Sequence, residues 1–192
     1  LSYVIAMEEV SRIDGSQAAT ITAHNSIGIG PLYMFGTEEQ KQKYLPKMCT
    51  GEMLWGFGLT EPNAGSDSRA TETTATKTNS GWTINGSKIF ITNVSNALAG
   101  GLTVQAKTGT KEDGSPELTC FIVEKDAPGL TIKPMHGKLM WRASDTAEVY
   151  MEGVEVTDDA IVGKQGDGSK QMLTALDYGR LGIAAMALGH AQ

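Results

Sequence analysis

The sequence predicts an α+β protein: the end of an N-terminal helical domain, a central antiparallel β-barrel or sandwich domain, and the first helix of a C-terminal helical bundle. Apolar residues have helical spacing up to about residue 52. Short runs of β-branched and aromatic residues alternate with turn residues from Met53 to about Val156. An apolar helical stripe returns from about Gly168. The expected domains are therefore residues 1–52, 53–160 and 161–192.

The N-terminal part is predicted to be helical. One face of a first helix carries the apolar residues Leu1, Val4, Ile5 and Val10. Asp14 ends this helix and can begin the next one. Further on, Thr37 and Gln40 have the spacing of a capping box, in which each side chain caps the other's backbone N–H. The helix that Thr37 opens is expected to end at Leu45, because Pro46 disfavours helical backbone in the residue before it.

The central part is predicted to consist of short strands. They are expected at residues 54–60, 70–78, 81–85, 87–92, 102–107, 118–124, 130–133, 147–151 and 153–156. Asn85 and Gly86 separate two of these runs, and this dipeptide is a strong signal for a hairpin turn. Many short strands at this spacing favour a barrel or a sandwich of antiparallel strands.

The last segment is predicted to be one helix with a broad apolar stripe made of Met172, Leu173, Leu176, Ile183, Ala184, Ala187 and Leu188. Small residues such as Gly182 and Gly189 would let a neighbouring helix approach closely. A helix with so large an apolar face needs partner helices. We therefore expect a further C-terminal domain after Gln192. Because no initiator Met precedes Leu1, we also expect the chain to begin inside a larger protein.

Composition and charge argue against several function classes. Of 192 residues, 40% are hydrophobic and 20% are charged, as in an ordinary globular protein. The formal net charge of -6 argues against nucleic acid or an anionic membrane as the main partner. No apolar run approaches the roughly 20 residues needed to span a bilayer, so membrane insertion is not expected. The N-terminus lacks the basic region and cleavage site of a signal peptide.

The sequence shows no metal site and no hydrolase nucleophile. Cys49 and Cys120 are too few and too isolated for a disulfide scaffold or a zinc site. The histidines have no metal-ligand spacing and are expected on the surface or in loops: His24, His136 and His190. Ser66 lies in no nucleophile-elbow motif, and no G-x-G-x-x-G segment follows a strand and opens a helix. Neither a serine hydrolase nor a nicotinamide-binding site is therefore supported.

Residues 59–67 (LTEPNAGSD) leave a predicted strand and enter a tight turn. Gly65 can adopt a positive φ, which turns successive N–H groups toward one point. Thr60 and Ser66 add hydroxyl donors. From the residues alone, two interpretations stay open. The segment is either a site for a phosphate or the polar edge of a ring, or a plain strand-to-turn connection capped by Asp67.

These nine residues resemble the flavin-binding signature of the acyl-CoA dehydrogenase family, whose pattern is close to LTEPxAGSD. Three further segments resemble other patterns of the family. Residues 85–93 (NGSKIFITN) resemble NGxKxWITN, with Phe90 in place of the usual Trp. Residues 137–146 resemble KLGxRxSxT, with Met140 where Gly is usual. Residues 176–192 resemble the LDxGRxGIAxxALGxAQ helix of short-chain, butyryl-type members.

The resemblance implies FAD as the cofactor. The flavin would be lined by Phe57, Leu59, Thr60, Gly65, Ser66, Phe90, Ile91 and Thr92. In the family, the Thr at position 60 bonds the pyrimidine side of the flavin, and the Thr at position 92 lies near N5. The acyl-CoA substrate would contact Ser66, Asp177, Tyr178, Gly179 and Arg180. Asp177 and Arg180 also fit a plain surface ion pair on one helix face. The resemblance places three further residues in a structural loop of the barrel: Arg142, Ser144 and Thr146.

The implied activity is FAD-dependent α,β-dehydrogenation of an acyl-CoA thioester to the trans-2-enoyl-CoA, with electrons passed to an electron-transfer flavoprotein. Family members are usually homotetramers, and the location would be cytoplasmic in a bacterium and the mitochondrial matrix in a eukaryote. The catalytic base in most members is a Glu beyond the position of Gln192, and in some a Glu at the position of Gly179. We therefore expect no catalytic residue in this chain, and no dehydrogenase activity from these residues alone.

Two alternatives stay open. An acyl-CoA oxidase or a flavin monooxygenase would use the same fold, and rapid reoxidation of the reduced protein by air would favour it. A non-enzymatic β-barrel binding module flanked by helices would show no yellow flavin spectrum in the folded full-length protein.

Overall fold

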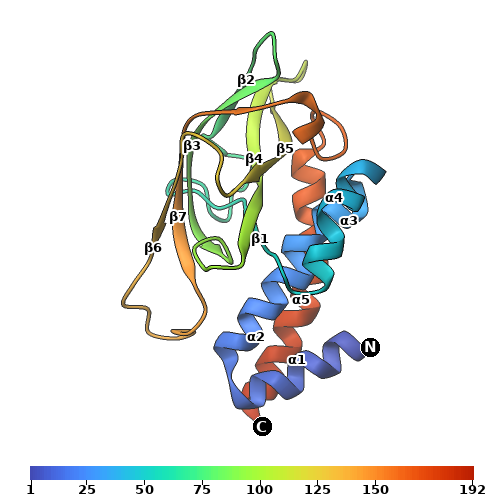
Figure 1. Ribbon diagram of the computed structural model, residues 1–192, viewed down its shortest axis with the longest axis vertical. Coiled ribbons are helices and arrows are strands. Elements are labelled where there is room, and N and C mark those ends of the chain that lie inside the picture. The colour runs from blue at the N-terminus through green and yellow to red at the C-terminus, as the bar shows by residue number, and fades with distance from the viewer.

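The computed structural model describes residues 1–192 and arranges them as a β-sheet beside a layer of helices (Figure 1). The helices are α1 (Ser2–Ile13), α2 (Gly15–Thr22), α3 (Ile29–Phe35), α4 (Glu38–Cys49) and α5 (Gly168–Ala191). A π-helical segment, η1 (Ala23–Gly28), joins α2 to α3. The strands are β1 (Leu54–Gly58), β2 (Thr74–Lys77), β3 (Trp82–Thr92), β4 (Ala99–Thr110), β5 (Pro116–Glu124), β6 (Leu130–Pro134) and β7 (Thr146–Val156), and a 3₁₀ turn, η2 (Asp158–Ala160), follows β7. The predicted α+β class is confirmed.

Helices α2 and α4 begin at the predicted capping residues. The Asp14 carboxylate accepts hydrogen bonds from the N–H of Ser16 at 2.7 Å and of Gln17 at 3.4 Å. The Thr37 hydroxyl accepts from the Gln40 N–H at 3.2 Å, and the Gln40 side chain accepts from the Thr37 N–H at 3.0 Å. The predicted capping box is therefore confirmed.

The predicted end of α4 at Leu45 is wrong, because the helix continues through Pro46 to Cys49. Proline has no N–H, so its position inside the helix removes one backbone hydrogen bond. The extra turn buries Met48, which belongs to the core between helices and sheet. At the end of this turn, the carbonyl oxygen of Pro46 accepts a hydrogen bond of 3.1 Å from the N–H of Thr50.

The buried faces of the first and last helices differ from the predicted stripes. In α1 the buried residues are Met7 and Ser11, whereas Leu1 and Ile5 are exposed. The buried residues of α5 are mostly small: Gly168, Gln171, Met172, Ala175, Gly179, Gly182, Ala185, Met186 and Gly189. Five members of the predicted stripe are exposed instead, namely Leu173, Ile183, Ala184, Ala187 and Leu188. The cause is the close approach of α1, because a Cβ on Gly189 would lie 2.2 Å from the carbonyl oxygen of Glu8.

The strands form one sheet in the order β1-β4-β2-β3-β7-β6, and β5 also pairs with β4. Four of the six strand pairs are antiparallel, but β4 runs parallel to both β1 and β2. Because β5 covers one edge of β4 from Gly101 to Thr110, β1 and β2 must share the other edge. Strand β1 lies opposite residues 99–104, and β2 begins opposite Lys107. The chain between β1 and β2 therefore leaves this edge and returns to it.

The sheet curls around its own core. The rings of Trp82 in β3 and Phe121 in β5 lie 5.5 Å apart, although β4 and β2 separate their strands in the sheet order. The largest apolar cluster fills the inside of this curl and includes Ile84, Leu102 and Val149. A second cluster joins the sheet to the helices and includes Leu32, Trp55 and Met172. A third lies between α1, α2 and α5 and includes Met7, Ala18 and Met186.

The hairpin predicted at Asn85–Gly86 is wrong. Strands β3 and β7 both run without a break through this region, so the expected strand pairs 81–85 with 87–92 and 147–151 with 153–156 are each one strand. The register shifts so that Glu152 and Gly153 together oppose Asn85, whose side chain accepts a hydrogen bond of 2.8 Å from the Gly153 N–H. The dipeptide Asn85–Gly86 therefore lies at a β-bulge rather than in a turn. Strand β2 is also shorter than its expected range, 70–78.

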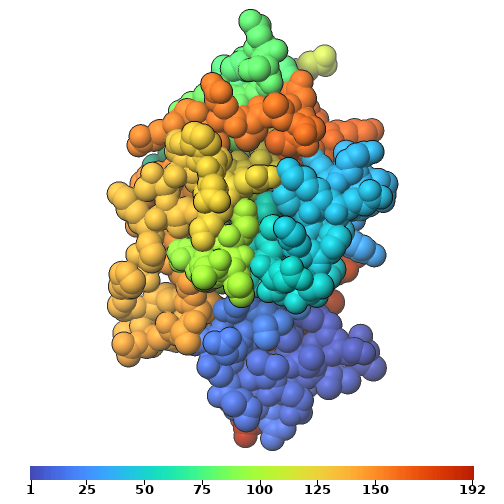
Figure 2. All heavy atoms as spheres, viewed as in Figure 1, coloured from blue at the N-terminus to red at the C-terminus, as the bar shows by residue number.

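Figure 2 shows the first helices, in blue, at one end of the molecule and the β2 region, in green, at the other. The first and last helices meet, since the Ser11 hydroxyl donates to the carbonyl oxygen of Met186 at 3.1 Å. No helix in the structure combines the length and the apolar character that crossing a membrane requires.

Candidate functional site

The candidate site is built by the chain segment between β1 and β2. Residues 59–73, called the excursion below, leave the edge of β4 after Gly58 and rejoin it at Thr74. Within the excursion, Glu61 and Ala64 exchange two backbone hydrogen bonds of 3.0 and 3.2 Å, which close a tight turn. The residues of the first family-like segment thus stand outside the sheet and next to it.

The excursion is held against the sheet at two points. The carbonyl oxygen of Thr60 accepts a hydrogen bond of 2.9 Å from the N–H of Ile89 in β3. Further along, the buried side chain of Gln105 in β4 donates to the carbonyl oxygen of Ser68 and to the Thr71 hydroxyl, both at 2.9 Å. These bonds fix the backbone on both sides of the tight turn.

A cavity of about 370 Å³, called the first cavity, lies between the excursion, the end of β3 and the helical layer. Its lining includes all the residues that the sequence predicts for the cofactor: Phe57, Leu59, Thr60, Gly65, Ser66, Phe90, Ile91 and Thr92. The remaining lining residues come from η1, β1, the excursion and α5: Ala23, Ile27, Trp55, Ser68, Leu173, Leu176 and Arg180. The structure brings the predicted residues together around one space, and their binding role stays a prediction.

The wall of the first cavity combines apolar surface with hydroxyl groups that have no partner in the protein. These hydroxyls belong to Thr60, Ser66, Ser68 and Thr92. The N–H groups of Thr60, Gly65 and Ser66 also donate to no other backbone group. Between these donors lie the apolar side chains of Phe57, Leu59 and Ile91. Such a wall suits a flat, largely apolar ligand with acceptor atoms along one edge.

Two positions in this wall have an unexpected backbone. Gly65 does not adopt the positive φ that the sequence would allow, since its φ lies outside the left-handed region. A Cβ on Gly65 would meet no atom within 4 Å, so the glycine leaves space rather than enabling a turn. Phe90 instead has a φ of 62°, which is rare for a bulky residue. It lies where the register of β3 and β7 shifts, and the residue is 61% exposed at this bulge.

A buried ion pair that was not predicted from the sequence joins the excursion to β3. The Lys88 ammonium lies 2.6 Å from a Glu61 carboxylate oxygen, with both side chains at most 1% exposed. Burial raises the pKa of Glu61, but the charge of Lys88 and the bonded N–H groups outweigh it, so the pKa stays below its ordinary value. Burial lowers the pKa of Lys88, and Glu61 opposes this shift. One signal in the sequence could have revealed this pair. Lys88 follows the apolar Ile84 by four residues along β3, so both side chains point to the same, buried face of the sheet.

A second cavity of about 550 Å³ adjoins the first and shares Ala23, Ile27, Thr92, Leu176 and Arg180 with it. Among the residues predicted for the substrate, Ser66 lines the first cavity, Gly179 lines the second and Arg180 lines both. Asp177 and Tyr178 line neither cavity. Asp177 forms an exposed ion pair with Arg180, as the plain surface interpretation predicted.

No Asp or Glu lines either cavity. The residue that could hold a base on α5 is Gly179, and a Cβ there would already lie 3.0 Å from the Ile27 side chain. The two cavities therefore offer hydroxyl, amide and guanidinium donors, but no carboxylate that could take a proton from a ligand.

The loop that precedes β7 fastens the helices to the sheet. The Ser144 hydroxyl accepts a hydrogen bond of 3.0 Å from the Thr20 hydroxyl in α2. The Lys138 ammonium donates to the Thr146 hydroxyl at 2.8 Å. Ser144 and Thr146 also line the second cavity, whereas Arg142 is exposed and does not. The structural role that the resemblance implied for Arg142, Ser144 and Thr146 stays a prediction, which the bonds of Ser144 and Thr146 support.

The remaining chemistry-bearing residues lie apart from one another. Cys49 is exposed, Cys120 is buried, and neither forms a disulfide. His136 and His190 are exposed, but the expectation of a surface or loop position is wrong for His24, which is 5% exposed inside η1. No cluster of three or more His, Cys, Asp or Glu side chains is placed to hold a metal ion.

Two family models match the chain. The model described as acyl-CoA dehydrogenase, N-terminal domain, matches residues 1–52, and the one described as acyl-CoA dehydrogenase, middle domain, matches residues 56–154. The probable acyl-CoA dehydrogenase YngJ of Bacillus subtilis is 45% identical over 192 residues, which are 100% of this chain and 50% of that protein. The short-chain specific acyl-CoA dehydrogenase of Clostridium acetobutylicum is 43% identical over 192 residues, again 100% and 50%. The chain thus spans about half the length of these curated relatives.

Solved structures agree with this similarity. Butyryl-CoA dehydrogenase from Megasphaera elsdenii has a TM-score of 0.91 and 42% identity, over 98% of this chain and 49% of that chain. A glutaryl-CoA dehydrogenase from Mycobacterium smegmatis in complex with FADH2 has a TM-score of 0.90 and 34% identity, over 98% and 46%. A chain from the structure of an electron transferring flavoprotein of Acidaminococcus fermentans has a TM-score of 0.91 and 43% identity, over 98% and 49%.

Proposed function

Because the chain belongs to the acyl-CoA dehydrogenase family, we propose that the full-length protein is an FAD-dependent enzyme that oxidises an acyl-CoA thioester to the trans-2-enoyl-CoA. The first cavity is the observation that supports this proposal most. It gathers the predicted flavin-lining residues and carries four unpaired hydroxyls on an otherwise apolar wall. The flavin ring system is flat, apolar on both faces and polar along one edge, and this wall suits it. The relative in complex with FADH2 supports the same cofactor.

In this proposal, FAD supplies the acceptor for the hydride that leaves the β-carbon of the substrate, and the protein orients and tunes it. Thr60 would donate to the pyrimidine edge of the ring, and Thr92 would donate near N5. Donors fixed in advance stabilise charge that develops during the reaction without reorganising. Phe57, Leu59 and Ile91 would exclude water from the ring.

The substrate side of the proposal rests on the second cavity and on α5. Arg180, which lines both cavities, would offer planar donors to oxygen atoms of the acyl-CoA. Ser66 and Gly179 would lie along the ligand, and Asp177 would hold the Arg180 side chain in place through their ion pair. The catalytic base would come from another part of the full-length protein, because no carboxylate lines either cavity.

The relatives support wider proposals about the assembly. Electrons would pass to an electron-transfer flavoprotein, in line with the neighbour from Acidaminococcus fermentans. The enzyme would act on short acyl chains, as the names of the Clostridium and Megasphaera relatives suggest. It would be a homotetramer, cytoplasmic in a bacterium and in the mitochondrial matrix in a eukaryote.

The test uses the full-length protein and three variants, Thr60→Val, Thr92→Val and Thr131→Val. Each of the first two removes one hydroxyl from the cavity and is expected to weaken FAD binding about fivefold, because a hydrogen bond contributes about 1 kcal/mol. Thr131 is an exposed residue of β6 and serves as the matched control, with unchanged affinity. Ultrafiltration of the holoenzyme at known FAD concentrations measures the dissociation constant.

Activity is tested by adding butyryl-CoA to the holoenzyme without oxygen. Bleaching of the flavin absorbance and formation of the enoyl-CoA are expected. A folded protein without flavin absorbance would contradict the proposal and favour a binding module. Bleaching that reverses within seconds in air would favour an oxidase instead.

A further inference from the structure

Lys88 and Glu61 form an ion pair that apolar packing alone does not explain. Their charged atoms lie 2.6 Å apart, and the side chains are 0% and 1% exposed. Taking two charges out of water is costly, and apolar side chains of similar volume often give equal or greater stability in such a place. The pair therefore calls for a role other than stability, and its further hydrogen bonds indicate one.

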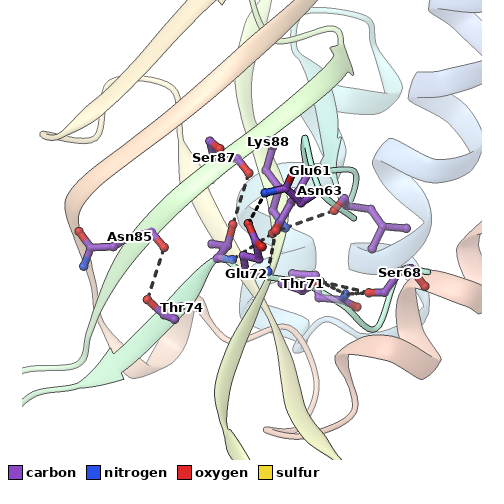
Figure 3. A network of polar contacts seen from close by, with 12 residues as sticks. Glu61, Asn63, Ser68, Thr71, Glu72, Thr74, Asn85, Ser87 and Lys88 are labelled. Atoms are coloured by element: carbon purple, nitrogen blue, oxygen red, sulfur yellow. Dashed lines mark hydrogen bonds and ion pairs between the residues drawn. The ribbon is translucent and has the colours of Figure 1, made fainter. Parts of the chain in front are cut away.

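The hydrogen bonds of the pair join three stretches of chain, as Figure 3 shows for Glu61, Glu72 and Lys88. The Glu61 carboxylate accepts from the N–H of Glu72 at 2.6 Å and of Thr73 at 3.1 Å, where the excursion ends. The Lys88 ammonium also donates to the carbonyl oxygen of Leu59 at 3.3 Å, where the excursion begins. Both ends of the excursion are therefore fastened to β3 at one point.

The ion pair is linked through the backbone to two residues that line the first cavity, Thr60 and Phe90. Thr60 stands in sequence between Leu59 and Glu61, which are both bonded to Lys88. Phe90 follows Ile89, whose N–H is bonded to the carbonyl oxygen of Thr60. A shift at the ion pair would therefore move Thr60 relative to Phe90, which the ladder of β3 with β7 holds in place.

We propose that Lys88 and Glu61 are positioning residues, which set the separation of Thr60 and Phe90 so that the first cavity fits the flavin. This inference rests on the proposed function, because it takes FAD as the ligand of that cavity. The opposite charges balance each other, so the contribution of the pair is geometric rather than a net field on the ligand. Burial raises the pKa of Cys120 to about 12, so this thiol stays neutral and adds no charge beside Lys88.

The test compares the full-length protein with variants of the pair. The double variant Lys88→Met/Glu61→Gln leaves no buried charge and keeps side chains of similar size, so the fold is expected to survive. Lys88→Arg keeps the charge and is the conservative variant, although its planar head group fits the site less well. The control is Lys41→Met/Glu38→Gln, which removes an ion pair on α4 that is partly open to solvent.

One readout needs no cofactor. Hydrogen–deuterium exchange in the apoprotein follows the N–H groups of Glu72, Thr73 and Ile89, which bond within this network. In the double variant these groups are expected to exchange about tenfold faster, because local opening becomes easier. Exchange in the interior of β4 and β5 is expected to stay unchanged, which separates a local loss of position from a general loss of stability.

The second readout is the flavin itself. The double variant is expected to bind FAD about 100-fold more weakly, as small misplacements of binding groups can cost that much. The midpoint potential of the bound flavin is expected to shift as well, and Lys88→Arg is expected to restore part of both properties. The control variant is expected to match the wild type in each measurement.

A double variant that folds and keeps wild-type exchange, FAD affinity and potential would overturn the proposal. A double variant that fails to fold would also overturn it, because the pair would then serve the fold as a whole. If the wild-type protein bound no FAD, the proposed function would fail, and faster exchange at Glu72, Thr73 and Ile89 would still support positioning by the pair. Unchanged exchange would refute positioning in that case too.

Discussion

The backbone N–H of Trp55 donates a hydrogen bond to Nδ1 of His24 across 3.2 Å, and Nε2 of the same ring donates to the carbonyl oxygen of Met48 across 3.0 Å. One imidazole thus joins η1, β1 and α4 beside the first cavity. Because Nδ1 accepts a hydrogen bond, the ring is neutral. Burial lowers the pKa of His24, and the hydrogen bond to Met48 opposes this only in part.

We expect His24 to make the protein less stable in mild acid. Its pKa in the folded state lies below that in the unfolded chain, so the unfolded state binds the proton more tightly. The contribution of neutral His24 to the free energy of unfolding is complete above about pH 6.5. It is lost as the pH falls toward the folded-state pKa, by at most about 1.4 kcal/mol per pH unit. Urea unfolding between about pH 5 and 7.5 measures this dependence.

The variant His24→Gln keeps a donor and an acceptor but has no charge to gain, so its stability should vary less with pH over this range. His136→Gln, at an exposed histidine, is the matched control and should keep the wild-type dependence. If His24→Gln and the wild type lost stability equally, the imidazole would not be the responsible group.

Phe90 provides a test of backbone strain. Its φ of 62° costs a residue with a Cβ about 1–2 kcal/mol, and glycine pays nothing at this angle. We therefore expect Phe90→Gly to be more stable than Phe90→Ala by about 1 kcal/mol, the reverse of the usual order in a strand. Thermal unfolding of both variants measures the difference. The same pair of substitutions at Thr131, in the extended strand β6, should show alanine as the more stable residue.

The contact between α1 and α5 leads to a prediction at Gly189. A Cβ there would lie 2.1 Å from the Ser11 hydroxyl and 2.2 Å from the carbonyl oxygen of Glu8. Gly189→Ala is therefore expected to destabilise the protein by about 1–3 kcal/mol, as overpacking does, although alanine normally favours a helix by about 1 kcal/mol. The control is Ala184→Gly, at an exposed position of α5, which measures the difference in helix propensity between alanine and glycine without overpacking. A gain of stability in Gly189→Ala would show that the helices can move apart at little cost.

Asp145 is expected to be important for the stability of the turn after β3. Its carboxylate accepts hydrogen bonds from the N–H of Asn93 at 3.2 Å and of Ser95 at 2.8 Å, from the Ser95 hydroxyl at 2.9 Å and from the Asn96 amide at 3.1 Å. Asp145→Ala leaves these donors unpaired and should cost about 2–4 kcal/mol in urea unfolding. Asp126→Ala, at an exposed aspartate without such bonds, should change stability by less than about 0.5 kcal/mol. Equal losses in the two variants would contradict the assigned role.

Local signals in the sequence predicted local structure well. The capping box of Thr37 and Gln40 involves residues three positions apart, and Asp14 caps the N–H groups directly after it, so both follow from short-range chemistry. The resemblance to the family predicted which residues meet at the first cavity, including Thr60 and Thr92. No local rule gives that result, because these two residues reach the cavity from separate elements.

Several failures of sequence reasoning involve distant partners. Asn85 is typical of a turn, but its side chain accepts a hydrogen bond from the N–H of Gly153 and lies at a β-bulge. The predicted apolar stripe of α5 includes Leu173 and Ile183, which are exposed, although the close approach of another helix that was predicted from Gly182 and Gly189 is confirmed. Lys88 lies 27 residues from Glu61 in the sequence. The residues that flank each of them give no indication that the two side chains form a pair.

The hydrogen bond from Ser11 to Met186 joins residues 175 positions apart. Closing so long a loop is entropically unfavourable until the sheet between the two helices has formed. The packing of α1 and α2 against α5 is therefore expected to be completed late in folding. During synthesis, the first helices leave the ribosome well before their partner helix exists. Their apolar faces stay open to chaperones, or to self-association, until the residues of α5 emerge.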